Sequence, residues 1–190
     1  MKNILLILGH PNKDSFCKAL LDAYAKSAQN AGYNVRMRYI GDMTFDPILW
    51  KGYNVIQELE SDLIDAQHDI KWANHIVFVY PTWWYTFPAL LKGFFDRVFL
   101  PGFAFKFHTP RKWDKLLKGR SARLIVTMNA PRIYYRWIVK SPGHRMMKAT
   151  LKFSGIKPIK ITDIGSIESL GDEKRKKWIE KVAELGKKGK

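Results

Sequence analysis

Short apolar runs alternate along the chain with stretches in which apolar residues recur at helical spacing. The first run, residues 2–8, is rich in Ile and Leu and ends at Gly9, which is typical of a strand buried on both faces of a parallel sheet. From Ser15 to Gly32 the apolar positions fall near one helix face, with Ser15 as the expected N-cap and Gly32 as the expected C-cap. The chain therefore begins with a strand, loop and helix unit.

The same alternation continues through the rest of the sequence. Later apolar runs predict strands, and the segments between them predict helices. The expected strands are residues 34–40, 74–80, 122–128 and 157–164, and the expected helices are residues 55–72, 88–98, 144–153 and 170–185.

Five strand and helix units in alternation predict a doubly wound α/β fold. Parallel strands need crossover connections, and right-handed crossovers place helices on both faces of the sheet. The expected strand order is 2-1-3-4-5, which places a ligand crevice beyond the carboxyl ends of the first and third strands. With no repeat or boundary visible, residues 1–190 are expected to form a single domain, in which the long connections 41–54 and 99–119 carry function.

Composition limits where the protein works and how it does chemistry. No apolar run reaches the length of a membrane span, and none has the form of a signal peptide, so we expect a cytoplasmic protein. The single cysteine, Cys17, can form neither an internal disulfide nor a CxxC redox pair. Any redox chemistry must therefore come from a cofactor.

The formal net charge of +16 permits anionic partners of several kinds. Nucleic acid, anionic membrane and phosphorylated cofactors all fit such a charge. The basic residues recur in separate pieces, which favours a solvated surface for most of them. Nucleic acid is a distant alternative, because no helix-turn-helix, zinc finger or RNA-binding signature is present. His68 and His75 have no metal-ligand spacing with another His, Cys or carboxylate, so we propose no metal.

The connection from Gly9 to Phe16 joins the first strand to the first helix. It lacks the GxxxxGK[ST] pattern of a Walker loop and the later glycines of GxGxxG. The exposed N–H groups of a helix start still favour a phosphate, to which His10 and Ser15 add donors. An ordinary capped loop is an equally good interpretation of these residues alone.

Three consecutive aromatic residues follow the third strand. Trp83, Trp84 and Tyr85 lie in a loop between Pro81 and Pro88, and a loop has no periodicity that would direct all three into a core. Some of them must face a ligand or a partner subunit. A planar heterocycle would stack on such residues, while backbone N–H groups bound its polar edge. A dimer interface is the alternative.

These segments together resemble the flavodoxin-like NAD(P)H:quinone oxidoreductase family. The resemblance rests on Gly9-His10-Pro11 with Ser15-Phe16, on Thr44-Phe45-Asp46-Pro47, and on the long stretch from Tyr80 to Phe105. This family includes mammalian quinone reductases, bacterial modulators of drug activity and ancillary subunits of potassium efflux systems.

The resemblance implies two groups of flavin contacts. Around the flavin phosphate it implies His10, Ser15, Phe16 and Cys17, although the family often has asparagine at the last position. Along the isoalloxazine ring, where backbone amides would serve N1, O2 and N5, it implies Pro81, Thr82, Trp83, Trp84 and Tyr85. For Lys92, Gly93, Asp96 and Arg97 we expect a structural role in packing and ion pairing.

The loop after the fourth strand carries the remaining candidates. Thr127 and Asn129 are implied at the flavin, but Met128-Asn129-Ala130 replaces a glycine pair that many members of the family have. Tyr135 follows Thr127 by eight residues, as does a tyrosine of quinone reductases that assists hydride transfer together with a later histidine. His144 matches that histidine only in its Gly-His context. We expect Tyr135 and His144 to be catalytic.

The function implied by the resemblance is a two-electron, ping-pong reduction. NADPH or NADH would reduce a flavin, with FMN the first choice and FAD the second, and the flavin would then reduce a quinone or nitroaromatic acceptor. A homodimer is expected because the sequence places more aromatic side chains at the surface than a monomer of this size usually exposes to solvent. These residues are Phe45, Trp50, Trp83, Trp84 and Phe103.

Two other functions stay open. A flavodoxin-type electron carrier shares the fold and FMN, but such carriers resemble small acidic proteins, whereas this chain is strongly basic. A regulatory ancillary subunit of a membrane potassium-efflux system is the second, since the basic surface suits a membrane channel as a partner.

Overall fold

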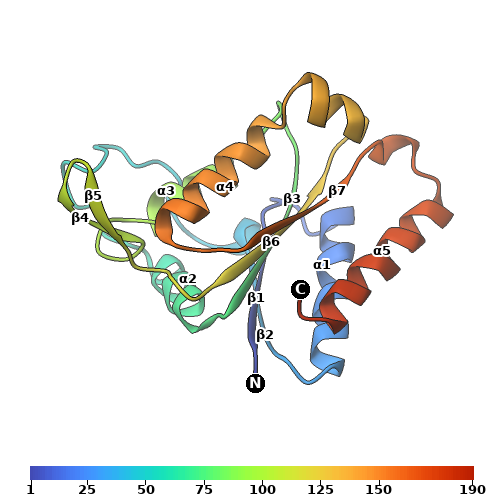
Figure 1. The fold of residues 1–190 in the computed structure, drawn as a ribbon, viewed down its shortest axis with the longest axis horizontal. Coiled ribbons are helices and arrows are strands. Elements are labelled where there is room, and N and C mark those ends of the chain that lie inside the picture. Colours follow the sequence, from blue (N-terminus) through green and yellow to red (C-terminus); the bar gives the residue numbers. More distant parts are fainter.

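A parallel sheet forms the centre of the computed structural model, which covers all 190 residues (Figure 1). Its five strands run in the order β2-β1-β3-β6-β7. Their bounds in that order are Asn34–Tyr39, Asn3–Leu8, His75–Pro81, Ser121–Thr127 and Ile159–Ile164. All neighbouring pairs are parallel, so the predicted order 2-1-3-4-5 is confirmed when the strands of this sheet are counted alone.

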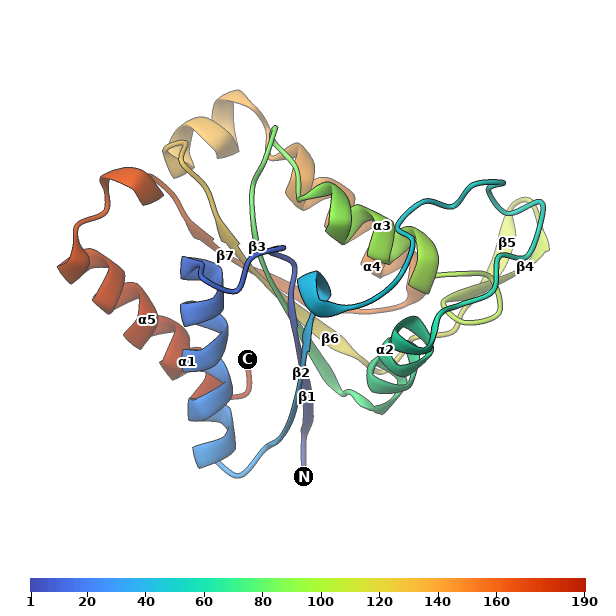
Figure 2. The same cartoon turned by 180° about the vertical axis from the view of Figure 1, so that it is seen from behind.

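Helices cover both faces of the sheet (Figures 1 and 2). On one face lie α1 (Phe16–Asn30) and α5 (Asp172–Lys187). On the other lie α2 (Ser61–Trp72), α3 (Ala89–Val98) and α4 (Pro142–Ser154). The doubly wound α/β, flavodoxin-like arrangement expected from the sequence is therefore confirmed.

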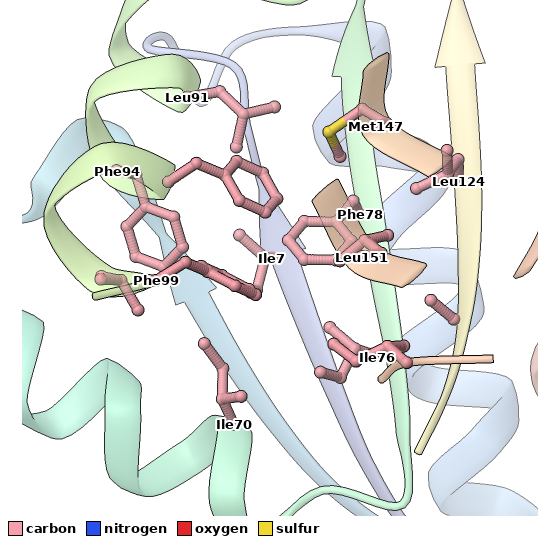
Figure 3. Packing of buried hydrophobic residues seen from close by; sticks show 14 of the residues in the cluster. Ile7, Ile70, Ile76, Phe78, Leu91, Phe94, Phe99, Leu124, Met147 and Leu151 are labelled. Atoms are coloured by element: carbon pink, nitrogen blue, oxygen red, sulfur yellow. The ribbon is translucent and has the colours of Figure 1, made fainter. Parts of the chain in front are cut away.

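Each face of the sheet has its own hydrophobic core. The larger core joins β-strand residues such as Phe78 and Leu124 to α3 and α4, as Figure 3 shows for Leu91, Phe94 and Leu151. The smaller core lies under α1 and α5. β3 is buried along its whole length, which explains why its sequence has no polar alternation.

Short elements complete the chain. Two antiparallel strands, β4 (Phe105–Thr109) and β5 (Lys112–Lys115), form a hairpin that stands away from the sheet (Figure 1). Single turns occupy η1 (Ile40–Asp42), η2 (Tyr134–Ile138) and η3 (Ile167–Ser169). No helix of the chain is long and apolar enough to cross a membrane.

The observed elements depart from the predicted ones at several ends. The helix expected over residues 55–72 begins only at Ser61, because the buried Arg97 guanidinium binds the Glu58 carbonyl and the Glu60 carboxylate in an extended segment. The helix expected from residue 144 begins at Pro142, where the missing proline N–H costs nothing. The hairpin within the 99–119 connection was not predicted.

The helix expected from Ser15 to Gly32 has the predicted caps to within one residue. Ser15 Oγ accepts from the Lys18 N–H, as an N-cap should. Ala31 ends the helix, and Gly32 follows it at φ +84°, the left-handed conformation in which glycine avoids a Cβ clash.

The carboxyl ends of β1 and β3 lie side by side at the point where the strand order reverses. Gly9, just after β1, donates its N–H to the Val79 carbonyl at 2.8 Å. A Cβ at Gly9 would lie 2.7 Å from Leu91 Cδ2 and 3.0 Å from Tyr80 Cβ, so a larger residue here would have to displace the Leu91 side chain of α3. The loops that follow these two strands are thus held together at one edge of the sheet.

Candidate functional site

A hollow of about 180 Å³ opens at this edge, between the start of α1 and the loops after β3 and β6. Nine of the eleven predicted flavin contacts line it, from three separate parts of the sequence. Its full lining is His10, Ser15, Phe16, Cys17, Pro81, Thr82, Trp83, Thr127, Met128, Asn129 and Ile167. The two predicted contacts outside this lining are Trp84 and Tyr85.

Two lining residues were missed from the sequence. Met128 is buried, and its N–H donates to the Ile164 carbonyl. Ile167 lies just after β7 and donates its N–H to the Met128 carbonyl at 3.2 Å. Its position after a fifth strand, whose carboxyl end must share this edge of the sheet, was the available signal.

The first turn of α1 offers free hydrogen-bond donors to the hollow. The N–H groups of Ser15, Phe16 and Cys17 have no protein acceptor, because the helical bonds begin at Lys18. The helix dipole adds partial positive charge at the same place. This geometry suits a phosphate or another anion.

His10 forms one wall of the hollow beside Trp83. Its Nδ1 accepts from the Asn12 N–H at 2.9 Å, and its ring meets the Trp83 ring edge to face at a centroid distance of 5.6 Å. Burial lowers the pKa of His10 below its usual value, although the Asn12 hydrogen bond opposes this. With Nδ1 occupied by Asn12, Nε2 is the ring nitrogen that has no protein partner.

Cys17 faces Thr127 at the base of the hollow. The Cys17 Sγ and Thr127 Oγ1 atoms lie 3.2 Å apart. Burial raises the pKa of Cys17 to about 12, so the thiol stays protonated and unreactive at neutral pH. Cys17 accordingly contributes its backbone N–H and a neutral side chain, and no redox chemistry of its own.

The loop after β3 makes a tight turn at Trp84 and Tyr85. Trp83 and Thr86 exchange backbone hydrogen bonds of 2.8 and 3.0 Å, and the Thr82 N–H donates to the Thr127 carbonyl. Trp84 and Tyr85 both have positive φ, at 47° and 64°, which is rare for bulky residues. Their N–H groups have no protein acceptor, and the Trp84 side chain is 93% exposed.

Tyr135 lies behind this turn, away from the hollow. Its hydroxyl donates to the Tyr85 carbonyl at 2.9 Å and accepts from the Gly143 N–H at 3.2 Å. A Cβ at Gly143 would lie 2.9 Å from both the Tyr135 hydroxyl and the Tyr85 carbonyl. Tyr135 therefore ties the aromatic turn to the first turn of α4, and burial raises its pKa.

His144 faces a buried carboxylate. Its Nε2 lies 3.2 Å from Asp163 Oδ1 without hydrogen-bond geometry, and the Arg136 guanidinium binds Asp163 Oδ2. Burial lowers the pKa of His144, against the opposing effect of Asp163. The His144 ring meets Tyr135 edge to face at 5.0 Å, so the two predicted catalytic residues contact each other but do not line the hollow.

Asn129 is engaged by the loop after β7. Its side-chain amide donates to Glu168 at 2.6 Å. In the segment Met128-Asn129-Ala130, the Met128 side chain is therefore buried, and the Asn129 side chain binds Glu168 of η3.

The residues expected to be structural do have structural contacts. Lys92 pairs with Asp96 on α3, and a Cβ at Gly93 would lie 2.3 Å from the Pro47 side chain. Arg97 is fully buried and binds Glu60. No three His, Cys, Asp or Glu side chains form a group that could hold a metal ion.

The exposed aromatic set is different from the one expected. Phe103 is buried in the larger core, because the turn before β4 folds back onto α3, and Phe45 is only partly exposed. Trp50, Trp83 and Trp84 are exposed as predicted.

The fold and this site define a flavodoxin-like protein in which a helix start with free N–H groups lies beside an aromatic loop. The family model described as flavodoxin-like fold matches residues 2–188, and the chain belongs to that family.

Relatives of this chain carry oxidoreductase names. An uncharacterized NAD(P)H oxidoreductase of Haemophilus influenzae is 33% identical over 96% of this chain and 93% of its own. A ribosyldihydronicotinamide dehydrogenase [quinone] of Pongo abelii is 27% identical over 94% of this chain and 87% of its own.

Solved structures agree with the fold over nearly the whole chain. A Streptococcus mutans protein superposes with a TM-score of 0.82 at 31% identity, over 98% of this chain and 99% of its own. An FMN-dependent NADH-azoreductase of Bacillus anthracis, solved with FMN, has a TM-score of 0.75 at 22% identity, over 99% of each chain.

Proposed function

We propose that this protein is a flavin-dependent NAD(P)H oxidoreductase that reduces quinones or nitroaromatic compounds by two electrons. The observation that carries the proposal is the hollow in which free N–H groups of a helix start adjoin an aromatic loop with two further free N–H groups. The names of the relatives, which include an NAD(P)H oxidoreductase and a quinone-linked dehydrogenase, support the same activity.

The residues present suit a flavin in both charge and shape. The N–H groups of Ser15, Phe16 and Cys17 would hold its phosphate. Trp83 and the turn at Trp84 and Tyr85 would lie along its ring, with the free N–H groups of the turn directed at the polar edge of the ring. When bound, a flavin would accept hydride from NAD(P)H and pass it to the acceptor.

In this proposal the chain's own groups near the hollow would bind and orient the flavin. Thr127 holds both neighbouring segments in place. Its carbonyl accepts from the Thr82 N–H, and its hydroxyl contacts the Cys17 Sγ. The catalytic roles of Tyr135 and His144 stay predictions, because their polar atoms face Tyr85, Gly143 and Asp163. A shift of the aromatic turn on ligand binding would be needed to bring Tyr135 to a reacting atom.

FMN is the flavin we propose. The free donors lie at the helix start, where a terminal phosphate fits, and the short loop from Gly9 to Ser15 has no feature that identifies an adenine pocket. The FMN named for the Bacillus anthracis azoreductase agrees with this choice. The proposal includes both NADPH and NADH as electron donors.

A homodimer completes the proposal. The hollow of about 180 Å³ is smaller than the roughly 300–1,000 Å³ of most small-molecule sites, so part of a flavin would extend beyond it. A second, larger groove of about 550 Å³ lies between α3, α4 and the hairpin, and is lined mainly by aromatic side chains. We propose that a second copy of this chain covers that groove.

We also propose that the protein works in the cytoplasm.

Flavin titration tests the proposal directly. We expect flavin-free protein to take up one FMN per chain and to bind riboflavin, which lacks the phosphate, roughly tenfold or more weakly. Reduction of the bound FMN by NADPH or NADH in a stopped-flow instrument then separates a hydride-accepting enzyme from a one-electron carrier. No uptake of FMN would remove the enzymatic assignment, whereas equal affinity for FMN and riboflavin would remove only the helix-start phosphate site.

A further inference from the structure

A basic stretch without carboxylates includes β6, η2 and α4. Residues 115–162 contain twelve Lys or Arg and no Asp or Glu. The carboxylate that follows, Asp163, has a fully buried side chain that is paired with Arg136. The next, Glu168, accepts from Asn129. The surface of this stretch therefore presents positive charge that its own carboxylates do not offset.

Exposed apolar side chains lie within the same stretch. Ile133, Trp137 and Ile138 on and next to η2 are 75%, 76% and 69% exposed. We refer to them, with the exposed Arg132, Arg136 and Arg145, as the basic aromatic patch. Large apolar side chains so fully exposed in a group mark an interaction surface more often than isolated ones do.

Trp137 stands between two shallow hollows whose rims are basic. One, of about 430 Å³, has Arg132 and Arg136 in its lining, together with Gly165 and Ser166. The other, of about 310 Å³, has Arg136, Arg145 and Lys148. Trp137 and Arg136 line both. An apolar centre with cationic hollows on each side suits a surface that offers both acyl chains and phosphate groups.

A second exposed apolar group differs in charge. Ile48, Tyr53, Val55 and Ile56 lie in the segment between η1 and α2, which also carries Asp46, Glu58 and Glu60. Glu60 is paired with Arg97, but Asp46 and Glu58 outnumber the one cation of the segment, Lys51, so the segment is unsuited to an anionic surface. It supplies a matched control for the basic aromatic patch.

We infer that the basic aromatic patch docks the protein onto an anionic lipid bilayer. Trp and Ile side chains would enter the boundary between headgroups and acyl chains, and Arg132 and Arg145 would bind lipid phosphates, whereas the charge of Arg136 is offset by its pair with Asp163. Each Lys or Arg near an anionic membrane contributes about 1 kcal/mol, so several together with an apolar anchor give reversible binding. The inference concerns peripheral attachment and requires no bound flavin.

The patch adjoins the candidate flavin hollow. The loop after β6 supplies Met128 and Asn129 to the hollow and Arg132 to the patch, and the loop after β7 supplies Ile167 to the hollow and Gly165 to the patch side. A docked molecule would hold the mouth of the hollow near the bilayer. If the proposed function holds, acceptors dissolved in the bilayer are therefore its substrate class.

Vesicle sedimentation tests the apolar part of the patch. We expect the full chain to sediment with phosphatidylglycerol-rich vesicles and not with phosphatidylcholine vesicles. Trp137→Ser with Ile138→Ser should weaken this binding roughly tenfold or more, because the inserted apolar area is lost. The matched pair Val55→Ser with Ile56→Ser removes two exposed apolar side chains elsewhere and should leave binding unchanged.

A charge-matched comparison tests the basic part. Arg132→Gln with Arg145→Gln should weaken vesicle binding roughly ten- to thirtyfold, whereas Lys174→Gln with Lys177→Gln on α5 should have an effect of less than about threefold. Both double substitutions remove two positive charges, so a difference in vesicle binding between them would reflect where the charges lie and not the net charge. Binding should also fall as salt rises.

Three results would overturn the inference. One is a wild-type chain that does not bind anionic vesicles at low salt. Another is a patch variant that binds as well as its matched control. The third is a patch variant that changes the sedimentation of the protein alone, which would assign the patch to contacts between copies. Flavin uptake measured on every variant separates these results from failure of the proposed function, because uptake should be unchanged by patch substitutions.

Discussion

Two aromatic residues in left-handed backbone conformations mark the candidate site at the scale of single residues. Trp84 and Tyr85 have positive φ, where a bulky side chain usually costs free energy. The strain is held by the Trp83–Thr86 hydrogen bonds and by the Tyr135 hydroxyl beneath the turn. Such strain is often retained where a turn must present its backbone to a ligand.

Replacing Trp84 should separate stability from flavin binding. Trp84→Asn should raise the free energy of unfolding of the flavin-free protein by up to about 1 kcal/mol, because asparagine tolerates positive φ and the exposed indole buries nothing. The same variant should bind FMN roughly tenfold more weakly if the indole stacks on the ring. Urea unfolding and FMN titration measure the two effects. Lower stability together with unchanged FMN affinity would contradict both parts.

Removing the Tyr135 hydroxyl tests the predicted catalytic role. Tyr135→Phe should retain the fold and flavin content, lower stability by about 1–2 kcal/mol through two lost hydrogen bonds, and slow one hydride-transfer half-reaction roughly 10- to 1000-fold. Stopped-flow absorbance of the flavin separates the two half-reactions. Unchanged rates in both, with the stability loss present, would leave Tyr135 only a structural role behind the turn and would not affect the flavin assignment.

Sequence patterns located the lining of the hollow better than the direction of each side chain. His10, Cys17 and Thr127 could be placed together because the ends of parallel strands share one edge of a sheet. The contacts of Tyr135 and His144 could not be predicted in this way. Tyr135 meets backbone atoms of Tyr85 and Gly143, and His144 meets Asp163, which is distant along the chain. Such contacts depend on how α4 packs, which no local pattern encodes.

At the scale of elements, a buried arginine determines the course of the segment before α2. The Arg97 side chain on α3 binds the Asp46 and Glu58 carbonyls and the Glu60 carboxylate. These bonds hold the segment extended against α3, with Pro47 over Gly93. Residues 55–60 therefore do not join the helix that their neighbours form, and a prediction from local periodicity begins that helix too early.

Substituting Arg97 should destabilise the protein strongly. Arg97→Met leaves two carbonyls and the Glu60 carboxylate without their donor, and should lower the free energy of unfolding by roughly 3–5 kcal/mol. Lys92→Met on the same helix removes only the exposed pair with Asp96, and should cost no more than about 1 kcal/mol. Urea unfolding compares the two. Equal effects would show that the guanidinium does not hold this segment.

The hairpin β4–β5 is an element that periodicity did not reveal, because its short strands are mostly exposed and carry no core pattern. Its contact with the rest of the chain is aromatic. Trp113 stacks on Phe153 of α4 at a centroid distance of 4.8 Å and donates its Nε1–H to the Phe153 carbonyl. The hairpin borders the groove that we assign to a second copy.

At the scale of the whole molecule, two exposed surfaces could bind a partner, and they differ in charge and hydrophobicity. The groove between α3, α4 and the hairpin is apolar and includes Phe95, Phe107 and Phe153, whereas the patch around Trp137 is basic. α4 contributes to both from different sides, with Met146 in the groove and Arg145 beside Trp137. One surface can therefore serve a second copy while the other stays free for a membrane.

Disrupting the groove should separate the proposed dimer into single chains. Phe107 is 51% exposed on the hairpin, so Phe107→Asp should fold normally yet place a charge in an apolar interface. Sedimentation velocity at micromolar concentration should show a dimer for the wild type and for Ile133→Ser, which lies outside the groove, and a monomer for Phe107→Asp. A wild-type chain that is monomeric at these concentrations with full activity would contradict the dimer.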